Sequence, residues 1–260
     1  MILSYLHPTN EQAGLLSNGA LNVHKQIAQK NGTLEITQVI GDSHQLYIFM
    51  RFTAPEGTVL NAERYAFDGP KSGFYIDGVH SNYGYGWISI PDENPNDNVT
   101  DFVMTIHGEK STMGHKISLD LEDLCAAAPL PDKFKPILTG KWSASFNLDF
   151  KDTSKSYAPA QSVKVHGYDA TVESITLSPI SIAMKLSSAN IQGVRDAAEQ
   201  MENEPRFPIT ILYKDGTSET TAQSAFSTSQ GYNAIFFVTP FEKVVNDKEI
   251  SAVSFFGTTI

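Results

Sequence analysis

Most of the chain consists of short runs in which apolar and polar residues alternate, the two-residue period of a half-buried β-strand. The clearest run spans residues 141–150, where Trp142 begins a series of apolar residues at every second position. A second run, residues 45–52, is apolar on both faces, because Leu46 and Ile48 alternate with aromatic residues. That pattern predicts a central strand of a β-sandwich.

Turn signals predict how several strands pair. The dipeptide Asn31-Gly32 supplies the positive φ angles of a type I′ turn and predicts a hairpin of residues 23–30 and 33–40. Residues 98–107 and 115–121 are expected to form another hairpin. The Gly-rich segment Gly84-Tyr85-Gly86-Trp87 lacks the spacing of a phosphate-binding loop and is interpreted as a turn.

Three short helices are expected. Thr9 and Gln12 form a capping box that predicts a helix ending near Gly19. Apolar residues spaced three and four apart predict helices over residues 120–128 and 194–201.

The sequence thus predicts a mostly β protein: two β-sandwich (immunoglobulin-like) domains in tandem, with a few short helices. The polar, aperiodic residues 151–160 are interpreted as the linker. This places an N-terminal β-sandwich domain with long irregular loops at residues 1–152 and an immunoglobulin-like domain at residues 153–260.

Composition and charge narrow the functional classes. Hydrophobic residues make up 41% and charged residues 18% of the 260 residues, which is typical of a folded chain and not of a disordered one. The net charge of −10 comes without a Lys/Arg cluster, so nucleic acids and anionic lipid surfaces are not expected partners. No stretch reaches the length of a membrane span, and the first eight residues are too short and uncharged for a signal peptide. The chain is therefore expected to be cytosolic or a fragment of an anchored protein.

The order of elements resembles the extracytoplasmic region of Firmicutes membrane proteins related to anti-sigma factors, largely domains of unknown function. The resemblance rests on a short helix closing at Gly19, the Asn31-Gly32 hairpin, residues 45–52, residues 140–148 and a second β unit, and covers roughly residues 12–260. It implies a membrane anchor and a cytoplasmic segment ahead of this region, and no catalytic residues.

Candidate metal sites were weighed and set aside. With the apolar faces of their expected hairpin paired, His107 and His115 point to opposite sides of the sheet and cannot share an ion. The oxygen-rich stretch from Asp92 has Asp97 at the sixth position of a calcium loop, where glycine is required. Cys125, the single cysteine, is expected to be a buried structural thiol. No metal and no cofactor is expected.

Aromatic residues in an irregular, Gly- and Asn-rich region are the candidate contact site. Aromatic side chains on loops can stack on sugar rings or anchor a protein partner, or simply close the open end of a sandwich. The candidates for ligand or partner contact are Tyr75, Tyr83, Tyr85 and Trp87.

The functional hypothesis is a non-catalytic, extracytoplasmic sensory or interaction ectodomain of a membrane-anchored, anti-sigma-factor-like bacterial protein. Its expected partner is a protein or a cell-wall ligand, and its membrane contact is expected only through an anchor outside this chain. The alternative is a secreted carbohydrate-binding module or glycan-active enzyme that uses the aromatic loops. A cytosolic protein of unrelated function is a third possibility.

Overall fold

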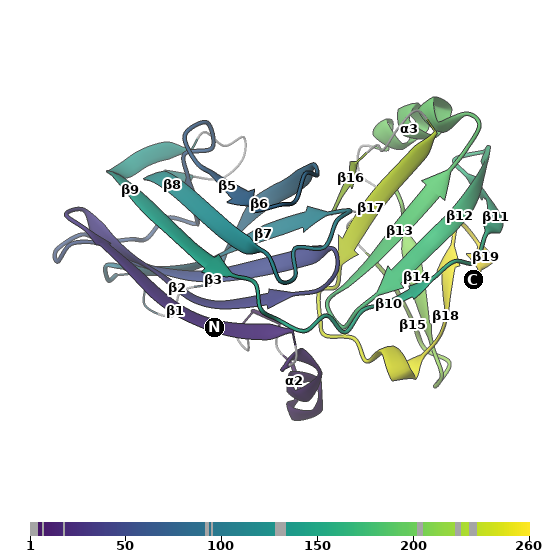
Figure 1. Cartoon of the computed structure of the whole chain (residues 1–260), viewed down its shortest axis with the longest axis horizontal. Helices are drawn as coiled ribbons and strands as arrows, with labels where there is room; N and C mark the ends of the chain where they lie inside the picture. The colour runs from purple at the N-terminus through teal and green to yellow at the C-terminus, as the bar shows by residue number, and fades with distance from the viewer. Residues whose placement is uncertain are drawn as a thin grey trace.

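The computed structural model describes residues 5–6, 8–17, 19–91, 94, 96–127, 134–201, 205–221, 225–228 and 233–260. Antiparallel β-strands dominate, which confirms the predicted mostly β class. Figure 1 shows the strands in two groups, one from each half of the chain. Within the described ranges, no helix is both long and apolar enough to cross a membrane.

The N-terminal strands form two antiparallel sheets. The first has the order β1-β2-β3-β7-β6, with β3 in the middle as predicted. Its strands are β1 (Ala20–Gln29), β2 (Gly32–Gly41), β3 (Gln45–Thr53), β7 (Val99–Gly108) and β6 (Tyr83–Ser89). In the second sheet, β8 (Lys116–Ala127) pairs with β4 (Arg64–Phe67), β5 (Gly73–Ile76) and β9 (Lys135–Asn147).

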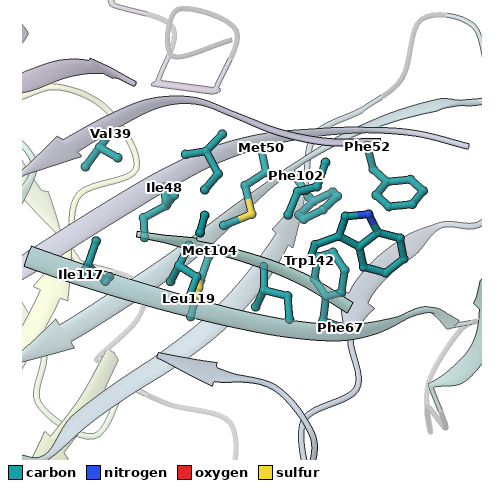
Figure 2. Close-up of a cluster of buried hydrophobic side chains, with 14 of the residues drawn as sticks. Val39, Ile48, Met50, Phe52, Phe67, Phe102, Met104, Ile117, Leu119 and Trp142 are labelled. Atoms are coloured by element: carbon teal, nitrogen blue, oxygen red, sulfur yellow. The ribbon is translucent and has the colours of Figure 1, made fainter. Parts of the chain in front are cut away.

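One apolar core joins these two sheets into an N-terminal sandwich (β1–β9). Side chains of β3, among them Ile48 and Met50, face Ile117 and Leu119 of β8 (Figure 2). Trp142 is fully buried among them, and its indole Nε1 donates a hydrogen bond to the carbonyl oxygen of Gly32 at 3.1 Å. The tryptophan therefore ties the second sheet to the first by packing and by a hydrogen bond.

The C-terminal strands form a second pair of sheets. The larger sheet contains β10 (Lys155–Tyr157), β11 (Gln161–Val165), β12 (Tyr168–Leu177), β13 (Ser181–Ser187), β17 (Ala234–Pro240) and β16 (Ala225–Thr228). The smaller sheet contains β15 (Ser218–Thr220), β14 (Ile209–Tyr213), β18 (Ile250–Phe255) and β19 (Thr258–Thr259). Both sheets contribute to one buried cluster, so they form a C-terminal sandwich (β10–β19) with its own core.

Helices are few. α2 (Asn10–Leu16) begins with the predicted capping box of Thr9 and Gln12, and α3 (Ile191–Glu199) covers most of the third predicted helix. A 3₁₀ turn, η1, spans Asp247–Glu249.

The helix predicted over residues 120–128 is wrong, because residues 116–127 form strand β8; Ala128 lies outside the described residues. Asp123 has a φ of 50° and lies at a bulge where the register against β9 shifts. A bulge adds one residue, so the inward face passes from Leu121 to Leu124 instead of to residue 123. The resulting three-residue step imitates helical spacing.

The hairpin predicted from residues 98–107 and 115–121 is also wrong. β7 pairs with β3 and β6, whereas β8 pairs within the opposite sheet. The two apolar faces meet, but across the core and not along a shared edge. Alternation alone specifies which face is buried and leaves the hydrogen-bonding neighbour open.

The structure differs from three smaller predictions. Gly84-Tyr85-Gly86-Trp87 is part of strand β6 and not a turn. The proposed linker contains strand β10, which pairs with β12. The first hairpin turns at Lys30 and Asn31, and only Gly32 has a positive φ there, so the turn is not type I′.

A buried carboxylate links the two sandwiches. Asp42, 3% exposed in the turn between β2 and β3, accepts hydrogen bonds from the backbone N–H groups of His44 and Gln45 at 2.7 and 2.6 Å. Its other oxygen accepts from the hydroxyls of Ser178 and Ser181 at 2.5 and 2.7 Å. Because both serines belong to the C-terminal sandwich, one side chain holds the turn and the junction together.

Apolar contacts surround this link. Tyr47 and Phe49 of β3 lie on the outer face of the first sheet and belong to a buried cluster that includes Ile180 and Val244 of the C-terminal sandwich. Nearby, the ring of His44 packs on Phe236 with centroids 5.0 Å apart. Part of the outer face of the first sheet is therefore covered by the other sandwich, and part by the N-terminal residues Tyr5, Leu6 and Leu16.

We expect Asp42→Ala to lower the free energy of unfolding by about 3 kcal/mol, because four buried donors lose their acceptor. Urea unfolding followed by circular dichroism measures this loss. Ser181→Ala, which removes one of these donors, should cost less.

Asp215→Ala is the matched control. Asp215 accepts hydrogen bonds from the backbone and hydroxyl of Thr217 in an exposed hairpin turn, so its loss should cost less than about 1 kcal/mol. Equal costs for the two aspartate variants would contradict the role given to Asp42.

Candidate functional site

The four aromatic candidates do not form one surface. Trp87 packs into the N-terminal core against Phe67 and Phe102, with ring centroids 5.5 and 5.7 Å apart. Tyr83 packs on the same core and donates its hydroxyl to the carbonyl oxygen of Lys110 at 3.0 Å. Burial raises the pKa of Tyr83 to about 12.

Only Tyr75 and Tyr85 remain strongly exposed, at 55% and 39%. The Tyr85 ring contacts Phe74 edge-on at 5.8 Å, between the edges of the two sheets. Tyr75 follows Phe74 on β5 and therefore points to the opposite face. The two exposed tyrosines lie on different surfaces.

The metal candidates are far from any shared site. His107 lies on the outer face of β7, whereas His115 precedes β8, with its Nδ1 2.8 Å from the carbonyl oxygen of Asp77. The part of the chain that the structure describes has no group of three or more residues of the metal-binding types. Of the oxygen-rich stretch that begins at Asp92, Asp92, Glu93 and Pro95 lie outside the described residues.

Cys125 is buried, as predicted, at 2% exposure. Burial and then the nearby Asp68 and Asp123 carboxylates raise the pKa of its thiol. The thiol therefore stays protonated and unreactive near neutral pH.

A pocket of about 440 Å³ lies where the two sandwiches meet. The outer face of the first sheet supplies one wall, with Gln45, Tyr47, Ile88, Thr105 and His107. The C-terminal sandwich supplies the other wall, with Ile211, Tyr213, Glu219, Thr220, Thr221, Pro240, Phe241, Glu242 and Val245, and Tyr5 also contributes. The size is within the range of small-molecule sites.

Two glycines of β6 make room on the first wall. A Cβ at Gly84 would lie 2.2 Å from Nε2 of His107, and one at Gly86 would lie 3.4 Å from Oγ1 of Thr105. The alternation of glycine with aromatic residues on β6 thus turns the rings toward the core and lets the His107 ring lie directly over Gly84.

Gln45 is the most unusual residue of the lining. Its side chain lies on the outer face of β3 and is 2% exposed, yet its Oε1 has no hydrogen-bond partner among the described residues. Its Nε2 donates only a long 3.3 Å hydrogen bond to the carbonyl oxygen of Leu46. A buried acceptor left unpaired costs about 1–3 kcal/mol, so this amide weakens the fold and needs another explanation.

Three titratable groups of the pocket, His107, Tyr213 and Glu219, are held in their uncharged forms or paired, whereas Glu242 is exposed to water. Burial lowers the pKa of His107, which favours the neutral imidazole. Burial and then Glu219 raise the pKa of Tyr213 to about 12. Glu219 is 2.7 Å from Nζ of Lys243 and accepts a hydrogen bond from the Tyr213 hydroxyl at 3.3 Å.

None of these pocket residues was a sequence-based candidate for binding. His107 was considered only as a metal ligand, and the others range from Tyr5 to Val245 along the chain. One feature of the sequence points to the pocket: the polar Gln45 begins a strand that is otherwise apolar on both faces.

The fold and this junction define an all-β protein made of sandwiches, a class that hosts many unrelated functions. No family model matches the sequence, and a search of curated proteins found no match.

A solved structure does share the fold. The crystal structure of the conserved domain protein from Bacillus anthracis, a member of the Firmicutes, superposes with a TM-score of 0.61 at 15% sequence identity. The similarity covers 92% of this chain and 78% of that one. The similarity therefore extends over both sandwiches.

We expect Gly84→Ala to lower the free energy of unfolding by about 1–3 kcal/mol, because the added methyl group overlaps His107. Gly86→Ala, on the same strand and face, makes only an ordinary contact and should change it by less than about 0.5 kcal/mol. Thermal unfolding of both variants tests this, and equal effects would show that the space above His107 is not tight.

The lowered pKa of His107 predicts a pH effect. The unfolded chain protonates this imidazole at a higher pH than the folded protein does, so folding stability falls as the pH drops below 6.5. We expect the wild type to lose more free energy of unfolding than His107→Gln when the pH falls from about 7.5 to 5.5, as measured by urea unfolding. The exposed His80→Gln is the control, and a constant difference for His107→Gln would contradict the prediction.

Proposed function

We propose that this chain is a non-catalytic binding domain: the extracytoplasmic sensory or interaction part of a membrane-anchored bacterial protein related to anti-sigma factors. The observation that carries the proposal is the pocket between the two sandwiches, lined by amide, hydroxyl and aromatic groups. The conserved domain protein from Bacillus anthracis, which shares this fold, comes from a bacterium, as the proposal requires of this chain.

Two titratable side chains of the pocket, Glu219 and Tyr213, favour binding over catalysis. General acid–base chemistry needs a group whose pKa lies near the working pH and that is free to exchange a proton. Glu219 is instead paired with Lys243, and the Tyr213 phenol keeps its proton, since its pKa is raised to about 12. These groups are suited to hold a ligand in place.

The net charge of −10 limits the partners in this proposal. It disfavours nucleic acids and anionic lipid headgroups, and leaves a protein or a cell-wall ligand. Membrane contact then occurs only through an anchor outside the given sequence.

The location can be tested in cells with an epitope tag after Ile260 of the full-length protein. In protoplasts, an added protease should remove the tag from an extracytoplasmic domain while a tagged cytoplasmic enzyme stays intact. A tag that is degraded only after the protoplasts are lysed would overturn the proposed location.

The exposure of Tyr75 and Tyr85 favours a second candidate, a secreted carbohydrate-binding module or glycan-active enzyme that uses one of these exposed rings. Tyr75→Ala and Tyr85→Ala should each abolish binding to isolated cell walls if this candidate is correct. Unchanged binding by both variants would exclude these two rings as its contacts.

A further inference from the structure

The pocket at the sandwich junction offers neutral hydrogen-bonding groups on both walls. Gln45 and Thr105 face it from the first sheet, and Thr220 and Tyr213 face it from the C-terminal sandwich. The buried Gln45 Oε1 is an acceptor that the described part of the protein leaves without a donor. The atom itself is closed off from the pocket, so a ligand hydroxyl supplies that donor only after the Gln45 amide turns toward the space.

The charges around the pocket argue against an ionic ligand. None of the described lining residues is Lys or Arg, and His107 is held neutral by burial, so an anion finds no counter-charge. A cation would also bind weakly, because Glu219 is already paired with Lys243 and Glu242 is exposed to water. The favoured ligand carries no net charge.

Apolar side chains complete the lining. Tyr5, Ile88 and Phe241 border the same space as the amide and the hydroxyls. A sugar ring has this dual character, with C–H faces that pack on aromatic or aliphatic groups and a rim of hydroxyls that form hydrogen bonds. A cavity of about 440 Å³ can hold one or two such rings.

We propose that the pocket between the two sandwiches binds a small, neutral, polyhydroxylated ligand of one or two sugar rings. The Gln45 amide turns toward the pocket so that its Oε1 accepts a ligand hydroxyl, and Thr105 contributes a second polar contact from the same wall. The inference rests on the proposed binding function and names the ligand class of that site.

The purified chain can be titrated with uncharged sugars by saturation-transfer NMR and calorimetry. The probes are glucose, maltose, N-acetylglucosamine and its β-1,4-linked dimer, with glucosamine and glucuronic acid as the positively and negatively charged comparators. We expect saturable binding of at least one neutral sugar and at least 10-fold weaker binding of its charged counterpart. No saturable signal from any neutral sugar at about 20 mM overturns the proposal, because the pocket then holds water only.

Gln45→Leu distinguishes a binding role from a structural one. Leucine nearly matches glutamine in size and removes the unpaired amide, so the urea midpoint should stay unchanged or rise while sugar affinity falls at least 10-fold. Thr105→Val should weaken binding in the same direction. A Gln45→Leu protein that unfolds more easily and binds normally contradicts the role of Gln45.

Tyr75→Ala is the matched control, because Tyr75 is exposed and is not part of the lining. It should bind as the wild type does. Loss of binding in Tyr75→Ala but not in Gln45→Leu would place the sugar at Tyr75 and overturn the pocket proposal.

The outcome of the sugar titration does not depend on the outcome of the protease test of location. A protected epitope tag would overturn the extracytoplasmic assignment but would leave the sugar titration of the purified chain intact. Failure of every neutral sugar would remove the ligand class and leave the protease result standing.

Discussion

The arrangement of the protein depends on how the carboxylate of Asp42 is satisfied. A carboxylate removed from water must receive hydrogen bonds, and here the donors come from its own turn and from two serines of the other sandwich. This requirement fixes the turn between β2 and β3 against the C-terminal sandwich. The walls of the pocket, which belong to different sandwiches, keep their spacing for the same reason.

Much of the fold follows from alternation in the sequence. The inward side chains around Trp142, the central position of β3 and the capping box of α2 were all predicted from local patterns, because each depends on neighbouring residues. The errors occurred where distant contacts decide the outcome. The bulge at Asp123 depends in part on its hydrogen bonds with Lys71 and Gly140, which no local pattern encodes.

The junction pocket could not be predicted from the sequence, because its walls come from both ends of the chain. A strand that is apolar on both faces predicts that its outer side is covered, but the pattern does not identify the segment that covers it. Of the aromatic candidates on β6, Tyr83 and Trp87 pack on the core, and the intervening Gly84 makes room for the His107 ring of the pocket wall.

Asp42, which is hydrogen-bonded to both sandwiches, also affects how the protein unfolds. Each sandwich has a separate core, which by itself would allow two independent melting transitions. Separating the sandwiches, however, leaves the carboxylate without two of its donors and exposes the apolar cluster around Tyr47 and Phe49. The loss of one sandwich is therefore expected to destabilise the other, so that the two cores melt together.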